Sequence, residues 1–564
     1  MSRLHAGTLA QLSALRPVLS SANSWALTAI VAAMLLALPL LAVAWIAFSA
    51  TDTIWPHLMA TVLPRALSNT ALLLVGAGTL ALMIGTPAAW LVTMYRFPGR
   101  SLADRMLVLP LAMPVYIVAY AYVDLLDFAG PVQTALRAAF GNTSLAAHII
   151  PDVRSLHGAI ALFAFVLYPY VYLSARATFI QQSVCALEVA RTLGQTAGGT
   201  FWSVALPMAR PALIAGVALV MMECLNDLGA VQYLGVETLS ASIYATWTQR
   251  SNLPGAAQLA LVMMALVAAL LIGERAARGE AAFHATTGRY RSIPFEVLEG
   301  WRAALALACV TIPVVLGFAV PFAVIVLHAG AHLNGLDWAA FAAAARNSLV
   351  LAGLVSAAAV TLAMIFAYAA RLHRSPATLF AVRASALGYA LPGTVLAIGL
   401  LAPLAAFDNA VDAWMRAQLG VSTGLVLSGS LFAVTLALVI RFLAVALGSI
   451  ESGLERISPN IDAAAKTLGT GSASALRRIH LPMLKPAIGA AALLVFVDAM
   501  KELPATLLLR PFNFETLATH IYGLTAAEQF EEAATGAVAI VVIGLIPVLM
   551  LHNAIAGGRT GSQG

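Results

Sequence analysis

The sequence predicts an all-α integral membrane protein with twelve transmembrane helices, arranged as two parallel six-helix repeats. Composition, the spacing of apolar runs and an internal repeat each support this fold class. Of the 564 residues, 61% are hydrophobic and only 10% are charged, with a mean hydropathy of +0.90. Soluble proteins are about 45–50% apolar and about 25% charged. This composition excludes soluble enzymes, nucleic-acid-binding proteins and disulfide scaffolds.

Apolar runs long enough to cross a bilayer, at roughly 20 residues per helix, recur along the whole chain. The first run is expected to stay in the protein as an anchor, because no small-residue cleavage site follows it closely. The predicted spans are about 26–50, 71–95, 106–126, 157–180, 209–230, 257–273, 303–328, 348–370, 380–405, 424–449, 486–503 and 536–555.

The basic residues predict the orientation of these spans. If both termini are cytoplasmic, most of the lysine and arginine falls in inside loops, as at Arg96, Arg275 and Lys466, and little falls outside, as at Arg65 and Arg510. Cytoplasmic loops of membrane proteins carry this excess. The chain is therefore expected to be a multi-pass membrane protein with both ends in the cytoplasm. Its net charge of +6 needs no nucleic-acid partner.

An internal repeat divides the chain. The segment Leu206–Leu213 aligns with Leu481–Ile488 at an offset of 275, and Asn69 and Pro114 align with Asn347 and Pro392 at 278. The matched positions include polar residues and proline in one order, which chance similarity between apolar runs does not produce. We expect a first six-helix half at 1–273, a cytoplasmic linker at 274–302 and a second half at 303–564, with a substrate path between parallel halves.

A motif recurs in the loop between the fourth and fifth spans of each half. In both copies, glycine ends a short alanine-rich segment, and nine residues later a hydrophobic-x-Leu-Pro segment opens the next span. The residues are Glu188, Ala190, Gly194, Leu206 and Pro207 in the first copy, and Asp462, Ala463, Gly469, Leu481 and Pro482 in the second. In the second copy alanine stands at the acidic position, and the acid precedes it by one place.

This spacing resembles the E-A-A-x3-G-x9-I-x-L-P loop of ABC-importer membrane subunits, and the fused layout resembles the ferric-iron uptake permeases. The resemblance implies a type I permease fold and loops that grip two copies of a cytosolic ATPase. It also implies a subunit of the bacterial inner membrane, to which a periplasmic binding protein would deliver the substrate. The chain has no G-x4-G-K-[ST] sequence for ATP, so the resemblance assigns ATP and Mg²⁺ to the partner, and this chain is expected to be no enzyme and to bind no cofactor.

Four acids lie in the fifth and eleventh predicted spans at matching positions. Glu223 and Asp227 in the first half align with Asp498 and Glu502 in the second. An acid at mid-bilayer costs about 2.5–3.5 kcal/mol on insertion scales and by default marks a pathway or a paired site. We expect these acids to line the translocation path. The alternative is that they pair with Lys501 or cap broken helix ends.

Related importers that carry different substrates share features with this sequence. The segments 223–239 and 501–512 resemble ferric-iron permeases, whereas thiamine permeases and some phosphonate permeases share the fused layout. A twelve-helix secondary transporter is the competing class, although it leaves the two matched loops without a purpose. Histidines at 57, 148, 157, 328, 332 and 520 show no metal-ligand spacing apart from the pair at 328 and 332, and no metal site is predicted.

Overall fold

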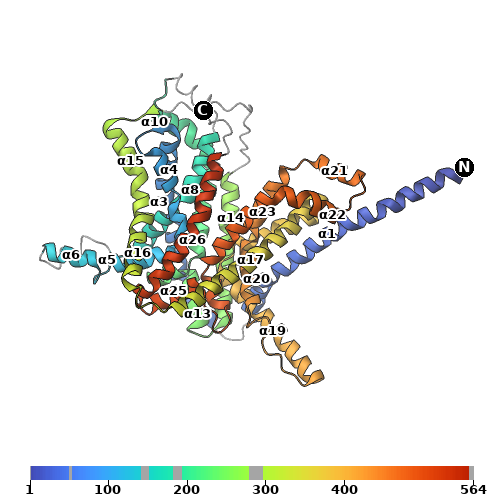
Figure 1. Cartoon of the computed structure of the whole chain (residues 1–564). Helices are drawn as coiled ribbons and strands as arrows, with labels where there is room; N and C mark the ends of the chain where they lie inside the picture. Colours follow the sequence, from blue (N-terminus) through green and yellow to red (C-terminus); the bar gives the residue numbers. More distant parts are fainter. Residues whose placement is uncertain (1, 50–53, 141–151, 182–193, 279–295, 558–564) are drawn as a thin grey trace. The chain divides into compact units, whose positions relative to one another are not determined.

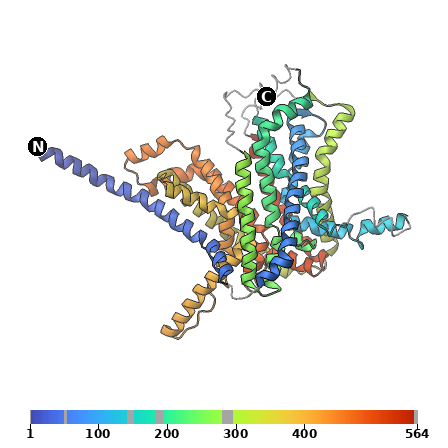
Figure 2. The same ribbon diagram turned by 180° about the vertical axis from the view of Figure 1, so that it is seen from behind.

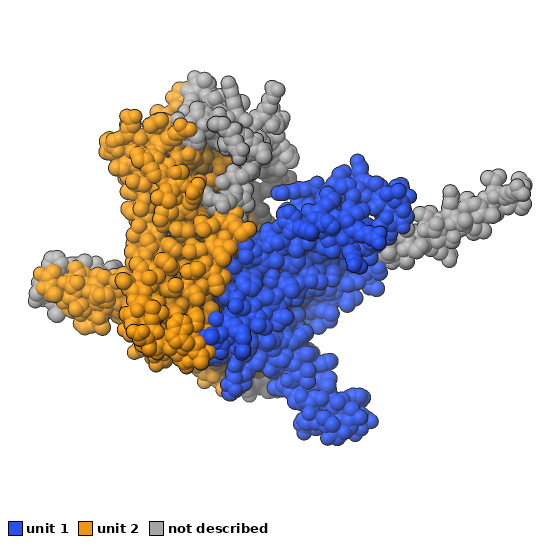
Figure 3. All heavy atoms as spheres, viewed as in Figure 1, with its two compact units in different colours: residues 1–49, 342–516 blue, residues 50–341, 517–564 orange. Residues whose placement is uncertain are grey.

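The computed structural model describes residues 2–49, 54–140, 152–181, 194–278 and 296–557, and within these ranges the chain is almost entirely helical (Figure 1). The helices form two compact units. Unit 1 joins Met1–Ser49 to Ala342–Thr516, and unit 2 joins Ala50–Phe341 to Leu517–Gly564. Figure 3 colours the two units separately.

Unit 2 is built around three long helices, α3, α8 and α11, which pack against one another. Figure 2 shows α3 and its neighbours from behind. Its helices longer than one turn are α3 (Leu63–Met94), α4 (Arg100–Met106), α5 (Val115–Leu126), α6 (Pro131–Phe140), α8 (Leu156–Gln181), α11 (Leu206–Asn226), α12 (Gly229–Tyr233), α13 (Leu239–Thr248), α14 (Leu253–Arg278), α15 (Gly300–Val314), α16 (Val320–His332), α25 (Leu517–Ala526) and α26 (Phe530–Gly557). A two-stranded parallel pairing joins β1 (Tyr95–Arg96), directly after α3, to β2 (Glu296–Val297).

Unit 1 is built around α20, which packs against α23, α19 and α24. Helix α1 lies along α18 and α19 in the same unit. Its helices longer than one turn are α1 (Ser2–Phe48), α17 (Trp338–Leu372, whose first four residues are counted in unit 2), α18 (Pro376–Ser385), α19 (Gly393–Leu419), α20 (Leu431–Glu455), α21 (Pro459–Thr467), α23 (Leu481–Met500) and α24 (Pro504–Leu509).

The prediction of twelve spans is confirmed, since twelve helices in the described part of the chain are long and apolar enough to cross a membrane. Several boundaries differ. The second span begins at Ile54 rather than near 71, because helix continues through a more polar stretch. The third and ninth spans are broken before α5 and α19, where Pro114 and Pro392 take extended ψ angles of 138° and 142°. Proline has no N–H with which to continue a preceding helix, so in each of the two spans a new helix begins at the residue after the proline.

Four short π-helical turns share one cause. They are η1 (Leu58–Val62), η3 (Phe201–Ala205), η4 (Val315–Ala319) and η6 (Leu476–His480), and in each case a proline follows two residues after the turn. A proline ring clashes with the carbonyl four residues earlier and cannot donate to it. The wider π turn takes up one extra residue at that point and lets the helix continue.

Close contacts between backbones hold the helices of each unit together. A Cβ placed on Gly85 of α3 would lie 2.9 Å from the carbonyl oxygen of Tyr168 on α8, and one on Gly399 of α19 would lie 2.3 Å from the carbonyl oxygen of Pro39 on α1. Only glycine permits these approaches. Small residues at helix crossings are the usual means of packing inside a membrane, where lipid and side chains are equally apolar.

The repeat is visible in matched hydrogen bonds. The side-chain amide of Asn69 donates to the carbonyl oxygen of Glu237 at 3.1 Å in unit 2, and that of Asn347 donates to the carbonyl oxygen of Glu515 at 3.0 Å in unit 1. The two asparagines are 278 positions apart in the sequence, and so are the two glutamates. The same side chain therefore holds the same loop in each copy.

The compact units divide the chain differently from the predicted sequence halves. Helix α1 belongs to the first half by sequence yet packs in unit 1, where Trp25 meets the ring of Tyr368 edge-on at 5.2 Å. Helices α15 and α16 belong to the second half yet pack in unit 2, where the Tyr122 hydroxyl donates to the carbonyl oxygen of Leu316 at 2.6 Å. The first span of each half thus lies among helices of the other, and most of the predicted linker, 279–295, lies outside the described residues.

Candidate functional site

The loop of the first half is described from Gly194 onward, and Glu188 and Ala190 lie outside the described residues. Gly194 has a φ of +83°, and a Cβ added there would meet no atom within 4 Å. The chain then returns through α10 (Ala197–Thr200) and η3 to α11, which begins at Leu206 with Pro207 in its first turn. The backbone conformation at this glycine is the left-handed one that ends helices.

The loop of the second half is fully described and carries helix α21. The Ser458 hydroxyl caps its start by accepting from the backbone N–H of Asn460 at 3.3 Å. Its end is a glycine cap at Gly469, with a φ of +74°, after which the Thr470 N–H bonds the carbonyl oxygen of Ala465 at 2.9 Å. The chain returns through α22 (Ser472–Ala475) and η6 to α23, which begins at Leu481 and Pro482. Ala463 is exposed on α21.

The Asp462 side chain is 19% exposed and makes close contacts within unit 1. Its carboxylate lies 2.8 Å from the Arg371 guanidinium at the end of α17 and 2.8 Å from Nε2 of the fully buried His480. The contact with Nε2 does not have hydrogen-bond geometry, and the other ring nitrogen, Nδ1, lies 3.1 Å from the carbonyl oxygen of Ala475. Arg371 also donates to the carbonyl oxygens of Leu454 and Ile457 at 2.6 and 2.9 Å.

We call Tyr368, Arg371, Asp462 and His480 the loop clamp. The Tyr368 hydroxyl completes it by donating to the carbonyl oxygen of Ser472 in α22 at 2.7 Å. Together these side chains tie both arms of the second loop to α17. A charged carboxylate bound by a guanidinium makes stronger hydrogen bonds than neutral groups do, so the clamp sets the position of α21 against α17.

The first half holds its loop with an apolar contact instead. Trp90, which aligns with Tyr368 at an offset of 278, packs against Phe201 of η3 with ring centroids 5.1 Å apart and against Phe179 of α8 at 5.3 Å. The position of His480 is taken by Ala205. From Gly194 and Gly469 onward the two loops share their backbone course, and among the described residues they are anchored by different side chains.

The four intramembrane acids fall into two classes. Asp227 and Glu502 stand at the breaks that follow α11 and α23. One Asp227 oxygen accepts from the backbone N–H groups of Ala230 and Val231 at 2.8 and 3.2 Å, at the start of α12. Glu502 accepts from the N–H groups of Ala505 and Thr506 at 2.9 and 3.0 Å, at the start of α24. These carboxylates satisfy amides that a new helix leaves unbonded.

Glu502 has in addition a buried cationic partner. Arg441 of α20 donates to Glu502 at 2.9 Å, and the two side chains are 9% and 1% exposed. The position that aligns with Arg441 in the first half is Val166. The break in unit 1 is thus closed by a buried ion pair, whereas the corresponding helix in unit 2 presents an apolar side chain.

The other two acids, Glu223 and Asp498, are partly accessible, as Asp227 is, whereas Glu502 is buried. Asp498 lies 2.9 Å from Lys501, with side chains 28% and 29% exposed. Glu223 is half-buried on α11. These two positions align at an offset of 275 and precede the breaks by one helical turn.

Comparison with known proteins identifies the family of this chain. A family model described as the binding-protein-dependent transport system inner membrane component matches residues 81–275. The Fe(3+)-transport system permease protein of Haemophilus influenzae is 27% identical over 86% of this chain and 89% of its own length. The sulfate transport system permease protein of Escherichia coli is 31% identical over 34% of this chain and 67% of its own. The chain belongs to this family of ABC-importer permeases.

A further relative shows the size of the repeated unit. The molybdenum transport system permease protein of Escherichia coli is 28% identical over 40% of this chain and 94% of its own length. Nearly the whole of that relative therefore corresponds to less than half of the present permease. The permease is a multi-pass inner-membrane transport subunit, and its family works with an ATPase and a substrate-binding protein.

Sequence analysis missed the cations that hold these sites. Arg441 lies in an apolar span, and Arg176 of α8 lies in another, where it binds both Asp104 oxygens at 2.7 and 2.8 Å. A charged residue within an apolar run signals a paired site by its cost alone, so both were detectable. Arg371 was counted only as a cytoplasmic charge.

Two of the histidines noted in the sequence, His328 and His332, each lie beside one acid. His328 Nε2 lies 2.8 Å from Asp124, and His332 Nδ1 lies 3.6 Å from Glu531. Among the described residues, no three histidine, cysteine, aspartate or glutamate side chains form a group that could hold a metal ion. His148 lies outside the described residues.

Replacing Asp462 by asparagine is expected to loosen the second loop. The change removes the charge that faces Arg371 and His480, and losing a hydrogen bond to a charged group costs about 1.5–3 kcal/mol. We expect a lower melting temperature of the purified transporter and slower ATP-driven uptake. Lys466→Gln, on the exposed side of the same helix, is the matched control. Equal melting temperatures and uptake for D462N and wild type would show that the clamp does not hold the loop.

Proposed function

We propose that the permease moves ferric iron, delivered by a periplasmic binding protein, into the cytoplasm by alternating access. The observation that carries this proposal is the extent of the resemblance to the ferric-iron permease, which runs through both halves over 86% of this chain. The sulfate and molybdenum relatives match only one half-sized stretch. A fused pair of halves is thus shared with the iron relative.

Two copies of a cytosolic ATPase would supply the driving force, one at each loop, with ATP and Mg²⁺ held by those copies. The matched left-handed glycines and the matched returns into α11 and α23 support equal docking of identical subunits. This arrangement puts both termini in the cytoplasm, in keeping with the positive-inside rule. The loaded binding protein would dock near 231–255 and 504–532. On the other side of the membrane, the exposed face of α21, which includes Ala463, would fit into a groove on the ATPase.

Within this proposal the acids divide by role. Glu223 and Asp498 would each line the path for a cation from their own helix, because both are partly accessible and neither stands at a helix break. Asp227 and Glu502, first expected to line it as well, would act on the path through the helix breaks they cap. Closing and opening of the ATPase would move the two loops, and the helices that begin at Leu206 and Leu481 would carry that movement to these breaks.

Oxyanion import is the second candidate, favoured by the 31% identity with the sulfate permease. Thiamine and phosphonate import are further alternatives with the fused layout, and one phosphonate relative is 28% identical over 36% of this chain. Carboxylates at Glu223 and Asp498 repel an anion, which favours a cationic cargo. A secondary transporter would need no ATPase at all.

The substrate can be identified by ATPase stimulation in proteoliposomes. The permease and its ATPase are reconstituted, and binding proteins loaded with Fe³⁺, sulfate, molybdate, a phosphonate or thiamine are added in turn, with each unloaded protein as the control. We expect stimulation by the Fe³⁺-loaded protein alone. Stimulation by another loaded protein without any by the iron-loaded one would reject ferric iron, and uptake driven by a proton gradient without ATP would reject the importer.

A further inference from the structure

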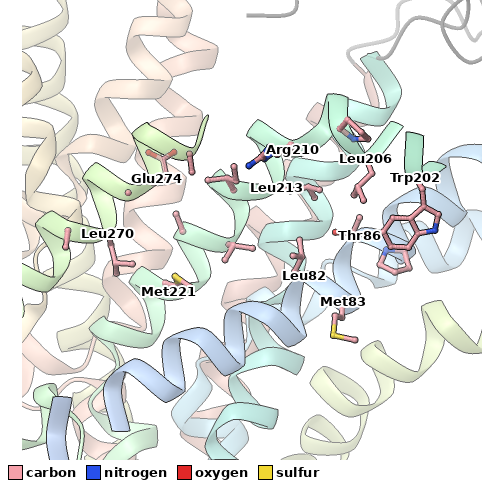
Figure 4. A pocket seen from close by; sticks show the side chains of 18 of the residues that line it. Leu82, Met83, Thr86, Trp202, Leu206, Arg210, Leu213, Met221, Leu270 and Glu274 are labelled. Carbon is pink, nitrogen blue, oxygen red and sulfur yellow. The ribbon is translucent and has the colours of Figure 1, made fainter. Parts of the chain in front are cut away.

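An apolar cavity of about 1050 Å³ opens between α3, α11 and α14 of unit 2 (Figure 4). Its walls are formed by aliphatic and thioether side chains such as Leu82, Leu213, Met221 and Leu270. Lining residues run along α11 from Leu206 to Met221, about 22 Å at 1.5 Å per residue. One leaflet of the hydrocarbon core is about 15 Å deep, so the cavity is long enough to hold an acyl chain that lies along the helices.

A polar atom inside this cavity lacks a partner. Thr86 of α3 is 5% exposed, lines the cavity, and its hydroxyl makes no hydrogen bond. The hydroxyls of Thr70 and Thr93 on the same helix each donate to the carbonyl four residues earlier at 2.6 Å. A buried hydroxyl without a partner is costly. The ester carbonyl of a lipid is an acceptor that would satisfy it.

One end of the cavity is marked by charge, and an interfacial aromatic residue also lines the cavity. Arg210 and Glu274 lie at this end in Figure 4, and Arg210 is exposed. Trp202 lines the cavity near Leu206, where α11 begins, and is 69% exposed. Tryptophan is enriched where a helix meets the membrane surface, and basic pockets between membrane helices on the cytoplasmic side bind lipid head groups.

We propose that this cavity is a phospholipid site. One acyl chain fills the apolar space between α3, α11 and α14, an ester carbonyl accepts from Thr86, and the phosphodiester lies at Arg210. The lipid belongs to the cytoplasmic leaflet in the proposed orientation. Because Leu206 and Pro207 line the cavity, the bound lipid packs directly against the point where the first coupling loop enters its span.

Gly273 offers a means of closing the site. It lines the cavity on α14, and a Cβ added there would meet no atom within 4 Å. Leucine at this position therefore projects into the cavity without displacing protein atoms. Gly330 of α16 also has open space around its Cβ position and does not line the cavity, so Gly330→Leu is the matched control.

The test uses the full transporter in nanodiscs that contain a phosphatidylethanolamine with a photoreactive diazirine in its acyl chain. After illumination, labelled peptides are mapped by mass spectrometry. We expect label on peptides of α3, α11 and α14, and about tenfold less in G273L, since each methylene excluded from the cavity weakens binding. Labelling in G330L should equal that of wild type.

Two more variants examine the polar contacts. Thr86→Val keeps the shape of the side chain and removes its hydroxyl, whereas Arg210→Gln removes the positive charge. Each variant should lower labelling about threefold to tenfold. Unlabelled phosphatidylethanolamine should compete for the site in wild type, and diacylglycerol, which lacks the phosphate, should compete poorly. In R210Q the two competitors should become equal.

Three outcomes would overturn the proposal. The first is no label on α3, α11 and α14, which would mean that the cavity is empty or is filled by another part of the chain. The second is equal labelling of G273L and wild type. The third is equal competition by both lipids in wild type, which would show that the apolar surface alone attracts them. None of these outcomes depends on which substrate the permease carries.

Discussion

Replacing Glu502 by glutamine is expected to lower the free energy of unfolding of the permease by about 3–5 kcal/mol, because it leaves Arg441 buried without a counter-charge. The carboxylate also accepts from two backbone N–H groups and from the Thr506 hydroxyl at 2.7 Å. Glutamine must turn its NH2 group toward one of these donors. Chemical denaturation of the purified protein in detergent measures the loss.

The first half provides the matched control. Asp227→Asn changes the aligned acid, but asparagine caps a helix about as well as aspartate, and the position aligned with Arg441 is Val166. We expect a change below about 1 kcal/mol. The double variant R441V/E502Q should recover part of the loss, with a coupling energy of about 1–3 kcal/mol.

This comparison separates the two roles weighed for the acids. If E502Q unfolds at the same denaturant concentration as wild type while uptake falls, the carboxylate acts on the substrate and the ion pair has no structural role. If stability falls in E502Q and not in D227N, the acid holds the break after α23. We expect the second result.

Valine at both loop glycines, G194V/G469V, is expected to reduce ATP-driven uptake by about tenfold or more. Both glycines have positive φ, at +83° and +74°, and an L-residue with a Cβ pays about 1–2 kcal/mol in that region. No neighbouring atom obstructs the new side chain at either site. The effect therefore comes from the backbone, which would leave the left-handed turn and change the direction of the chain at each glycine. Uptake in proteoliposomes and ATPase pull-down measure it.

Two nearby glycines serve as controls in the same loops. Gly198 and Gly471 also have open space at the Cβ position, and neither has a positive φ. G198V/G471V should therefore retain most of the uptake and still bind the ATPase. Normal uptake in G194V/G469V would contradict the coupling role of the loops. Equal loss in both double variants would show that bulk, rather than backbone conformation, disrupts docking.

Local patterns carried the sequence predictions that the structure confirms. Twelve spans follow from apolar runs, because a helix in lipid must be apolar over about 20 residues. Asn69 and Asn347 aligned by sequence and make the same hydrogen bond in each copy. Boundaries were less accurate wherever a proline breaks a span, as at Pro114 and Pro392, since hydropathy does not respond to such breaks.

These sequence patterns did not predict which groups the individual charged side chains contact. Asp462 is adjacent in sequence to the motif that suggested a partner contact, yet its carboxylate faces Arg371 and His480. Glu502 was predicted inside the eleventh span and lies instead just beyond it, at the break after α23, and its partner Arg441 lies on α20, 61 residues away. The alternative of capped helix ends and a pair with Lys501 describes much of what the structure contains.

By itself, the sequence determined the membrane class, the number of spans, the duplication and the two matched loops, because each depends on composition or on residues close together in the chain. Tertiary structure alone decided which helices pack together and which charges meet. Helix α1 packs with α18 and α19, and α16 packs with α26. Apolar helix faces resemble one another and lipid does not distinguish them, so association depends on the shape of small residues and on single polar contacts, which exist only once the helices are folded together.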